Sequence, residues 1–411
     1  MKVGGLALLL CVTFVGLYAQ EEQRVDDSVR QTIESFVEID EKEVSEVNKI
    51  KKMFKKGKAS GELKVMYASA PEVGEPYATA IGGILKYELA SYYGLSAGVA
   101  AYVSYDIPFA SGDGVNRSVE LSSSEGDYAD LGEAYINYRY ENFNFRAGRQ
   151  VIDTPLADSD NIRMIQNSFE AYIATYEVAG FEFMAGNLQH WTGYDADLDE
   201  GWSKTGKDGT NLVGVSYVDG LEFSAWYYNI TGFSNAAYFD LGFEYEVNDK
   251  ISLHTMVQYL YESELDKSGT EASIYGFMAE AVAYGVGINF AMNKSEKFDN
   301  KASFSGFGGG ALFTNMDTMI IDEITQDREV LSYVTGFTYT YKALSFLYAY
   351  GDFDGKEDSS GVKAHIREQN IGLGYNFNDE LSFGALYAIQ DDLEDSANDW
   401  NRMQVIVNYN F

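Results

Sequence analysis

Residues 399–411 read DWNRMQVIVNYNF, and this stretch decides the fold. Every second side chain from Met403 to Phe411 is apolar, and nearly all those between them are polar. Successive strand side chains point to opposite faces, so the stretch predicts a strand with one apolar and one polar face. A soluble edge strand can have this pattern. A final strand that ends on Phe, with aromatic rings at its tip, is more typical of an outer-membrane β-barrel, whose outer face meets lipid.

The same alternation recurs along the chain from residue 58 onward. We expect strands at 58–68, 77–92, 95–106, 130–140, 143–152, 168–178, 181–190, 210–218, 221–230, 236–247, 250–262, 272–283, 285–293, 330–341, 344–352, 365–377, 380–390 and 399–411. The connections alternate between one short turn and one longer loop, as in bacterial barrels with periplasmic turns and external loops. The sequence therefore predicts an all-β fold, a transmembrane antiparallel barrel of about 18 strands with room for water inside.

Composition excludes other classes of protein. The chain has 411 residues with 32 Tyr, and its mean hydropathy is −0.23. Beyond the first residues no apolar run is long enough for a transmembrane helix, which needs about 18 residues. The formal net charge of −33 excludes nucleic acid as a partner, because the phosphates would be repelled. An acidic pore with acidic outer loops fits this charge better than a soluble acidic protein.

The first 57 residues differ from the rest. Residues 1–19 resemble a secretory signal peptide cleaved after Ala19, and Cys11, the one cysteine, lies within them. Residues 20–57 have apolar side chains at mostly helical spacing among many charges. They predict a periplasmic segment that is either an amphipathic helix or short coiled coil, or else disordered. The barrel domain is expected at 58–411.

The polar phase of each strand should line the lumen, because charge on the lipid face costs about 2–4 kcal/mol at the midplane. The expected pore-lining residues are Glu133, Arg139, Arg146, Glu170, Glu244 and Arg402. Acids outnumber bases in the whole polar phase. Arg139 and Arg146 flank a tight turn, and two interpretations stay open for them. They form a basic strip opposite acidic walls, or they only pair with Glu133 and Glu170.

Two long connections are candidates for narrowing the pore. The third external loop, 153–167, carries an acidic cluster with one base, and we expect Asp153, Asp158, Asp160 and Arg163 at the constriction if the loop bends inward. The alternative is a loop that lies over the mouth. The connection 294–328 contains FSGFGGGALF, whose apolar content favours an inward or subunit-facing position. The three aspartates are also weak candidates for Ca²⁺, without any EF-hand spacing; otherwise no cofactor is expected.

Several short motifs carry a resemblance to a known family. RAGRQVIDTPLADSDNIRMIQNSFEA (146–171), FKKGKASGELKVMY (54–67) and the terminal NYNF resemble segments of OprD-like porins, including the major outer-membrane porins of epsilonproteobacteria. The resemblance implies an 18-stranded barrel, commonly trimeric, with the third and seventh external loops bent inward. OprD-like porins conduct carboxylates along lumenal arginines. The acidic excess here departs from that pattern.

These observations predict an outer-membrane porin of a Gram-negative bacterium for passive diffusion of small hydrophilic solutes and ions, with a preference for cations. A substrate-selective carboxylate or amino-acid channel of OprD type is one alternative, and an adhesin or structural anchor is another. Catalysis is not expected, because His190, His254 and His365 lie on distant strands outside any nucleophile motif. The expected partners are the bilayer with lipopolysaccharide, the barrel-assembly machinery, and two further copies in a homotrimer.

The terminal Phe411 generates the first testable prediction, since by resemblance to other outer-membrane proteins it is an assembly signal. Deleting Phe411 should impair insertion into the outer membrane and leave secretion intact. Cell fractionation measures this, as protein that accumulates in the periplasm. Normal insertion of the shortened chain would contradict the assignment.

Overall fold

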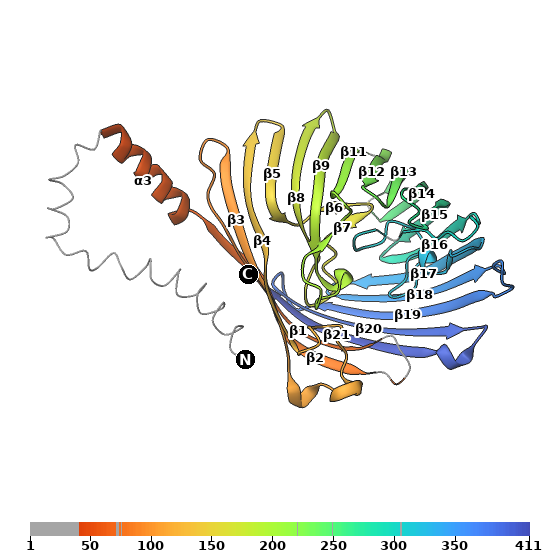
Figure 1. Cartoon of the computed structure of the whole chain (residues 1–411). Helices are drawn as coiled ribbons and strands as arrows, with labels where there is room; N and C mark the ends of the chain where they lie inside the picture. The colour runs from red at the N-terminus through yellow and green to blue at the C-terminus, as the bar shows by residue number, and fades with distance from the viewer. Residues whose placement is uncertain (1–40, 71–73, 75, 220, 249, 305) are drawn as a thin grey trace.

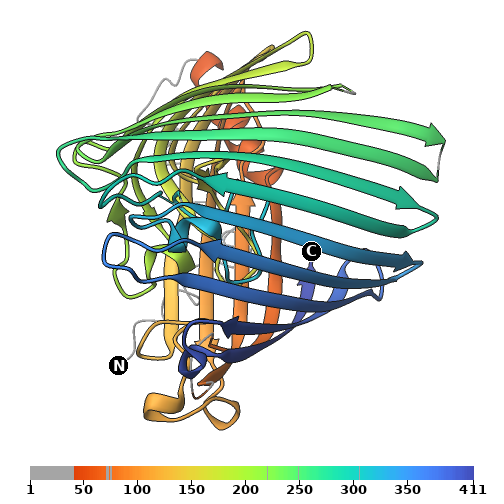
Figure 2. The ribbon, with the colours of Figure 1, turned by 90° about the vertical axis from the view of Figure 1, so that its right-hand side faces the viewer.

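The computed structural model describes residues 41–411 apart from 71–73, 75, 220, 249 and 305, and these residues form one closed antiparallel barrel (Figures 1 and 2). Its 18 strands are β1 (Lys58–Ser69), β2 (Tyr77–Glu88), β3 (Leu95–Asp106), β4 (Asp127–Tyr140), β5 (Phe143–Gln150), β8 (Ser168–Val178), β9 (Phe181–Thr192), β11 (Thr210–Asp219), β12 (Leu221–Ile230), β13 (Ser234–Asn248), β14 (Ile251–Glu264), β15 (Ala272–Ala283), β16 (Val286–Ser295), β17 (Val330–Tyr341), β18 (Leu344–Gly355), β19 (Ala364–Asn376), β20 (Leu381–Asp392) and β21 (Trp400–Asn410).

The remaining elements lie in the connections. The two-residue strand β10 (Ser203–Lys204) pairs with β9, and β6 (Asp153–Thr154) pairs with β7 (Ala157–Asp158) in a separate hairpin. Short 3₁₀ helices are η2 (Pro108–Ala110), η3 (Gly114–Asn116), η4 (Tyr194–Ala196), η5 (Ile321–Ile324) and η6 (Ser396–Asn398). All eighteen strands expected from the sequence are present, so the prediction of the fold is confirmed.

The barrel closes between β1 and β21, which pair in antiparallel fashion. Val65 faces Val407 in this register, and the backbones of Gly61 and Phe411 exchange two hydrogen bonds of 3.0 Å. A Cβ at Gly61 would overlap the backbone of β2. Gly61 therefore allows the close approach of β2 at the point where β1 receives the end of the chain.

The short turns follow from backbone conformations that only some residues adopt. Tyr93 and Gly94 have φ of 48° and 84°, and Tyr284 and Gly285 have φ of 53° and 83°. Two consecutive positive φ values are typical of the type I′ turn, whose twist matches that of the flanking strands. Glycine at the second position adopts this conformation without steric cost. These tight turns fix the register of the strands on both sides.

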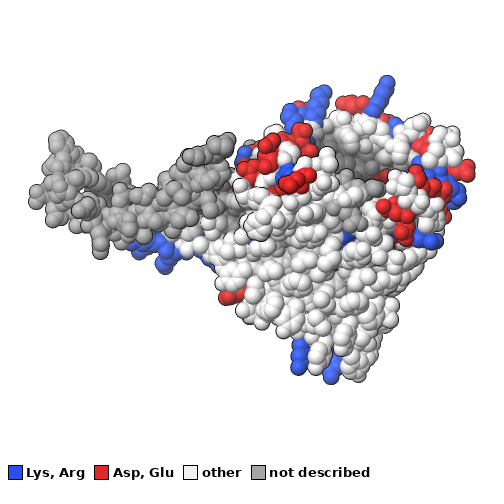
Figure 3. Space-filling view, turned by 90° about the horizontal axis from the view of Figure 1, so that it is seen from below, with Lys and Arg blue, Asp and Glu red and all other residues white. Residues whose placement is uncertain are grey.

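The outer wall is apolar. Leu63, Val65, Val407 and Tyr409 share the outward face of β1 and β21 and are exposed in the isolated chain. The middle of the wall turned toward the viewer in Figure 3 carries few charged side chains, which gather toward its margins. Lipid contact explains this distribution, since burying a charge in the bilayer core is costly.

A packed core lies inside the barrel, where we expected room for water rather than a packed interior. Lumenal side chains of β8, β9, β12 and β14, among them Phe169, Leu188, Tyr228 and Leu260, are fully buried. They pack against Leu156, Phe307, Leu312 and Met319 of two connections that fold inward. Burying one large apolar side chain stabilises by about 1.5–3 kcal/mol. Because this side of the lumen is filled with protein, open space is confined to the rest.

The N-terminal segment is described only in part. The expected signal peptide at 1–19 and the segment up to residue 40 lie outside the described residues. Residues Glu41–Lys55 form helix α3, which meets the barrel at the start of β1 (Figure 1). For this part the helical alternative is correct. Within the described chain, no helix combines the length and apolarity needed to cross a membrane.

Candidate functional site

The connection between β5 and β8, residues 151–167, crosses the barrel interior. Its Asn161 side chain accepts a hydrogen bond of 2.6 Å from Lys64 Nζ and donates one of 3.1 Å to Glu62. Lys64 also donates to the carbonyl of Arg163 at 2.9 Å. Glu62 and Lys64 belong to β1, which is separated from β5 by three strands. The connection therefore spans the lumen, in agreement with the inward alternative.

The connection between β16 and β17, residues 296–329, also lies within the barrel. Carboxylate and amide oxygens of the wall hold its backbone: Glu262 accepts from Phe304 N at 2.9 Å and Gln258 from Phe313 N at 2.7 Å. Glu368 accepts from Thr318 and Met319 in the same way. Buried polar groups need such partners, because leaving one unpaired costs about 1–3 kcal/mol. Polar side chains on the lumenal face of the wall therefore hold the backbone of this loop in place.

The two inward loops are joined to each other. Phe307 N donates to Leu156 O at 2.9 Å, and Asp158 N donates to Phe307 O at 3.1 Å. This short parallel bridge fixes the acidic hairpin β6–β7 against the second loop. A Cβ at Gly309, whose φ is +64°, would overlap the Asp158 side chain. Glycine is therefore needed where the loops meet.

Two arginines and two carboxylates form a buried group that we call the arginine cluster: Arg163, Arg402, Glu120 and Asp317. Arg402 pairs with Glu120, and its Nη1 lies 3.2 Å from Asp317 Oδ2. Arg163 lies 3.5 Å from Glu120 and 3.8 Å from Asp317. Glu120 comes from the connection between β3 and β4, so three separate loops meet β21 in this cluster. Its charges balance, with two of each sign.

Burial dominates the electrostatics of the arginine cluster. The Arg402 side chain is 1% exposed and that of Arg163 is 8% exposed. Burial raises the pKa of Asp317, which lies on a loop, to about 6 in spite of the attraction of Arg163. Buried ion pairs gain little net stability, but removal of one partner typically costs about 3–5 kcal/mol. The cluster therefore holds the loops in register more than it stabilises the barrel.

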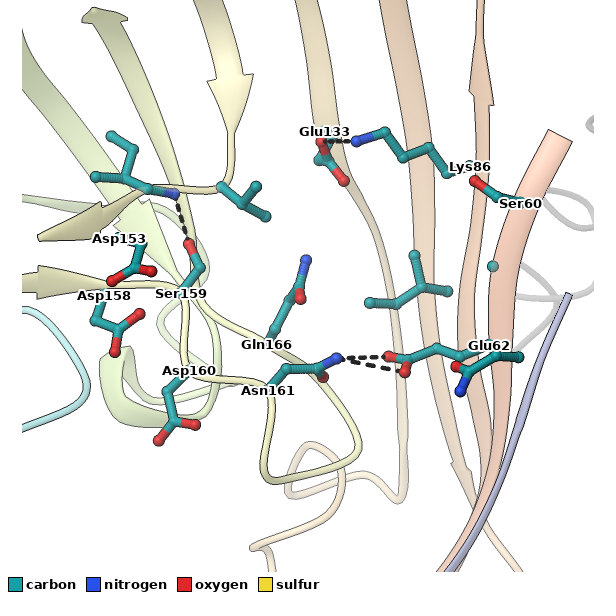
Figure 4. A pocket seen from close by; sticks show the side chains of 15 residues that line it. Ser60, Glu62, Lys86, Glu133, Asp153, Asp158, Ser159, Asp160, Asn161 and Gln166 are labelled. Carbon is teal, nitrogen blue, oxygen red and sulfur yellow. Dashed lines mark hydrogen bonds and ion pairs between the residues drawn. The ribbon is translucent and has the colours of Figure 1, made fainter. Parts of the chain in front are cut away.

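A hollow, which we call the passage, lies between the acidic loop and the wall of β1, β2 and β4 (Figure 4). It is a pocket of about 550 Å³. Six charged side chains line it: Glu62, Lys86, Glu133, Asp153, Asp158 and Asp160. Lys86 Nζ lies 2.9 Å from Glu133, and Glu62 lies 2.9 Å from Lys64, which is buried between β1 and the inward loop. The two carboxylates on the wall side, Glu62 and Glu133, are therefore each paired with a lysine.

The loop side of the passage stays acidic. Asp153 and Asp158 face each other in the β6–β7 hairpin, and Asp160 follows directly. Burial, together with repulsion from the other two aspartates, raises the pKa of Asp158 to about 6. None of the three makes an ion pair with any described residue. The described part of the chain also holds no group of three or more His, Cys, Asp or Glu side chains able to bind a metal ion.

Most of the expected pore-lining residues occupy the lumenal face. Glu133 lines the passage, and Arg146 lies 4.3 Å from the ring of Tyr135 on the same wall. Glu244 alternates with the outward Phe243 and Tyr245 on β13 and is exposed. Arg139 is exposed near the short turn after β4, 3.9 Å from Glu177. In the described part of the chain, neither Arg139 nor Arg146 forms an ion pair with Glu133 or Glu170, which pair with Lys86 and Arg149 instead.

Three expected positions need correction. Glu170 points outward, because it alternates with Phe169 and Ala171 of the inner core and shares its face with the exposed Tyr172. Its carboxylate meets Arg149 and His190 there. Arg402 does face inward, but the loops cover it.

Arg163 lies on the inward loop as expected, yet its guanidinium is buried in the arginine cluster rather than lining the passage. The sequence singled out neither Glu120 nor Asp317. Only the apolar content of 294–328 signalled that its loop turns inward.

Comparisons with known proteins agree on the fold. The model of a family described as outer membrane porin, OprD family, matches residues 95–411. OccAB2 of Acinetobacter baumannii is 15% identical, with a TM-score of 0.75 over 88% of this chain and 99% of that one. OpdK of Pseudomonas aeruginosa, solved with vanillate, is 15% identical, with a TM-score of 0.75 over 87% of this chain and 99% of that one. A BenF-like porin of Pseudomonas fluorescens Pf-5 is 14% identical, with a TM-score of 0.76 over 87% of this chain and 99% of that one. No curated protein matches significantly.

Replacing Arg402 by methionine tests the role of the arginine cluster. The variant removes the guanidinium that faces Glu120 and Asp317, a loss of about 3–5 kcal/mol for a buried pair. The loops should then leave their inward position more often, and single-channel recordings should show a larger and noisier conductance. Arg139→Met, which removes one lumenal charge without a loop contact, is the control. If the two variants show the same conductance without added noise, the arginine cluster does not hold the loops inward.

Proposed function

The chain belongs to the OprD family of outer membrane porins, and from this premise we propose that it is a narrow channel with a preference for cations. As a porin it lies in the outer membrane of a Gram-negative bacterium and lets solutes pass, and the family is one of channels rather than enzymes. Small hydrophilic solutes and ions diffuse passively through the passage beside the acidic loop. The observation that carries the preference is the charge of its lining: five carboxylates and one lysine.

The strength of the preference follows from the distances and the solvent. A unit charge 4 Å from an ion contributes about 1 kcal/mol in a water-like medium, and about 4 kcal/mol at an effective dielectric constant of 20. Asp153, Asp158 and Asp160 make no ion pair with a described residue, although Arg163 and Lys64 act on Asp160 from a greater distance, so the field of the loop acts on the passing ion. Salt shortens its reach to about 8 Å at physiological ionic strength. The preference should therefore be clear in dilute salt and weak in concentrated salt.

A second candidate function is selective uptake of a zwitterionic or carboxylate solute. Lys86, which lies across from the acidic loop in Figure 4, and Arg146 both lie over the ring of Tyr135. Opposed basic and acidic sides create a transverse field that orients a solute carrying both charges. The solved structure of OpdK with vanillate, a carboxylate, supports the same idea by similarity of fold. Micromolar block of the current by an amino acid or carboxylate, but not by a neutral sugar, would favour this candidate.

We extend the proposal to assembly. The porin forms a homotrimer, contacts lipopolysaccharide with its outer wall, and is inserted by the barrel-assembly machinery after removal of residues 1–19. The resemblance to OprD-like porins supports the trimer, the terminal Phe411 supports insertion by the assembly machinery, and the pattern of residues 1–19 supports their removal. Cross-linking in intact outer membranes tests the trimer, and the detection of monomers alone would refute it.

Neutralising the acidic loop tests the proposed selectivity. The triple variant D153N, D158N and D160N should lose most of the cation preference, because it removes three charges of the passage and keeps the side-chain volumes. Reversal potentials in a salt gradient measure the change. The control replaces Asp113, Asp208 and Asp266, exposed residues of other connections, by Asn. The proposal fails if both triple variants shift the potential equally, or if the wild type prefers anions.

The pKa of Asp158 generates a pH prediction. An unshifted aspartate stays ionised down to about pH 4, but a pKa raised to about 6 means that Asp158 is charged at pH 7.5 and largely neutral at pH 5. The cation preference should therefore fall as the pH is lowered through 6. Asp158→Asn should abolish this step, which separates it from titration of Asp317. Reversal potentials that stay constant over this range would contradict the prediction.

A further inference from the structure

Helix α3 has a surface that neither the barrel nor the passage explains. It projects sideways from the barrel, beyond the wall formed by β3 (Figure 1). Ile50 and Phe54 of its last turns are 49% and 55% exposed, although both are large apolar residues. They lie four positions apart, so they share one side of the helix.

The end of α3 is fixed to the outer wall of the barrel. Ala90 N donates a hydrogen bond of 3.1 Å to Met53 O, and the Tyr87 hydroxyl donates to Phe54 O. Tyr87 shares the outward face of β2 with Ile81 and Leu85, because it alternates with the lumenal Lys86 and Glu88. A Cβ at Gly57 would overlap the Tyr87 hydroxyl, so glycine allows this contact. The C-terminal end of the helix is therefore attached to the surface that meets lipid.

The helix lies at the end of the barrel that carries the short turns, which is the periplasmic end in this class of barrel. Its neighbours there are Tyr92 and the 78% exposed Tyr93 of the turn between β2 and β3. At three other short turns, Lys250 between β13 and β14 lies over Tyr284 between β15 and β16, and Lys342 after β17 lies over Tyr341. Aromatic rings and lysines of this kind mark the level of the lipid headgroups. The level of these turns is thus the inner surface of the outer membrane.

Charge distinguishes the end of α3 from the rest of the chain. Lys51, Lys52, Lys56 and Lys58 are exposed within eight residues, in a protein whose formal net charge is −33. Lys52 and Lys56 lie two positions from Ile50 and Phe54, which places them near the opposite side of the helix. Clustered basic residues next to a membrane attract anionic headgroups. A second copy of the helix would instead bring like charges together.

We propose that α3 lies in the inner leaflet of the outer membrane as an interfacial helix. Ile50 and Phe54 insert between the acyl chains, and the exposed lysines bind the phosphates of anionic phospholipids. The aromatic side chains at the periplasmic turns continue the same interface around the barrel. This placement is independent of the proposed selectivity and concerns how the porin is seated in its membrane.

A fluorescence experiment on the full chain tests the placement. In a background with Cys11→Ser, Ile50→Cys and Lys52→Cys are each labelled with an environment-sensitive dye and reconstituted in vesicles. Phosphatidylcholine alone is compared with phosphatidylcholine containing phosphatidylglycerol. The label at position 50 should shift to the blue in the anionic vesicles and be quenched several-fold more by bromo-lipids than the label at position 52. Equal quenching at both positions would overturn the proposal, as would disulfide-linked dimers of I50C.

A second experiment tests whether the lysines bind anionic lipid, with a separate check that each variant still folds into a barrel. K51Q, K52Q and K56Q together, in the I50C background, should reduce the blue shift in anionic vesicles and remove its sensitivity to salt. The matched control changes Lys204, Lys207 and Lys363, which are exposed in connections at the other end of the barrel, to Gln. Heat-dependent mobility in gels verifies an intact barrel in every variant. An unchanged shift in the first triple variant, or an equal loss in the control, would contradict lysine binding to anionic lipid.

Discussion

The arginine cluster is the contact on which the interior of this porin depends. Arg402 is the member that belongs to the barrel wall, and Glu120, Arg163 and Asp317 reach it from three different loops. Loops of this length gain little from local contacts, because closing them costs conformational entropy. A buried, charge-balanced cluster has few alternative arrangements, since any displaced loop leaves a charge without a partner. It thereby converts three flexible connections into fixed walls of a passage.

The filled side of the lumen and the passage are two consequences of the same loop positions. Apolar side chains of the inward loops pack against lumenal side chains of β8 to β18 in one buried cluster. The acidic hairpin β6–β7 is held against the second loop, and therefore faces the opposite wall of β1, β2 and β4. A barrel of this width would otherwise be a broad pore. Packing decides where the pore lies, and the acidic hairpin sets its charge.

Local sequence patterns predicted the barrel well, because strand alternation and turn length are local properties. The alternation placed Glu133, Arg146 and Glu244 on the lumenal face correctly. It failed for Glu170, since the lumenal neighbours Phe169 and Ala171 are apolar there, and the rule that polar side chains face the lumen reverses on the packed side. The burial of Arg402 and Arg163, and the roles of Glu120 and Asp317, could not be predicted, because they depend on loops that meet only in three dimensions.

The central claim is that the inward loops narrow the lumen of a wide barrel. Exclusion of neutral polymers measures this directly, because a polymer lowers the conductance only if it enters the pore. We expect that only the smallest polyethylene glycols reduce the single-channel conductance of the wild type. If polymers that need the full width of an 18-stranded lumen reduce it as strongly, the loops do not fill the barrel, and the account is wrong.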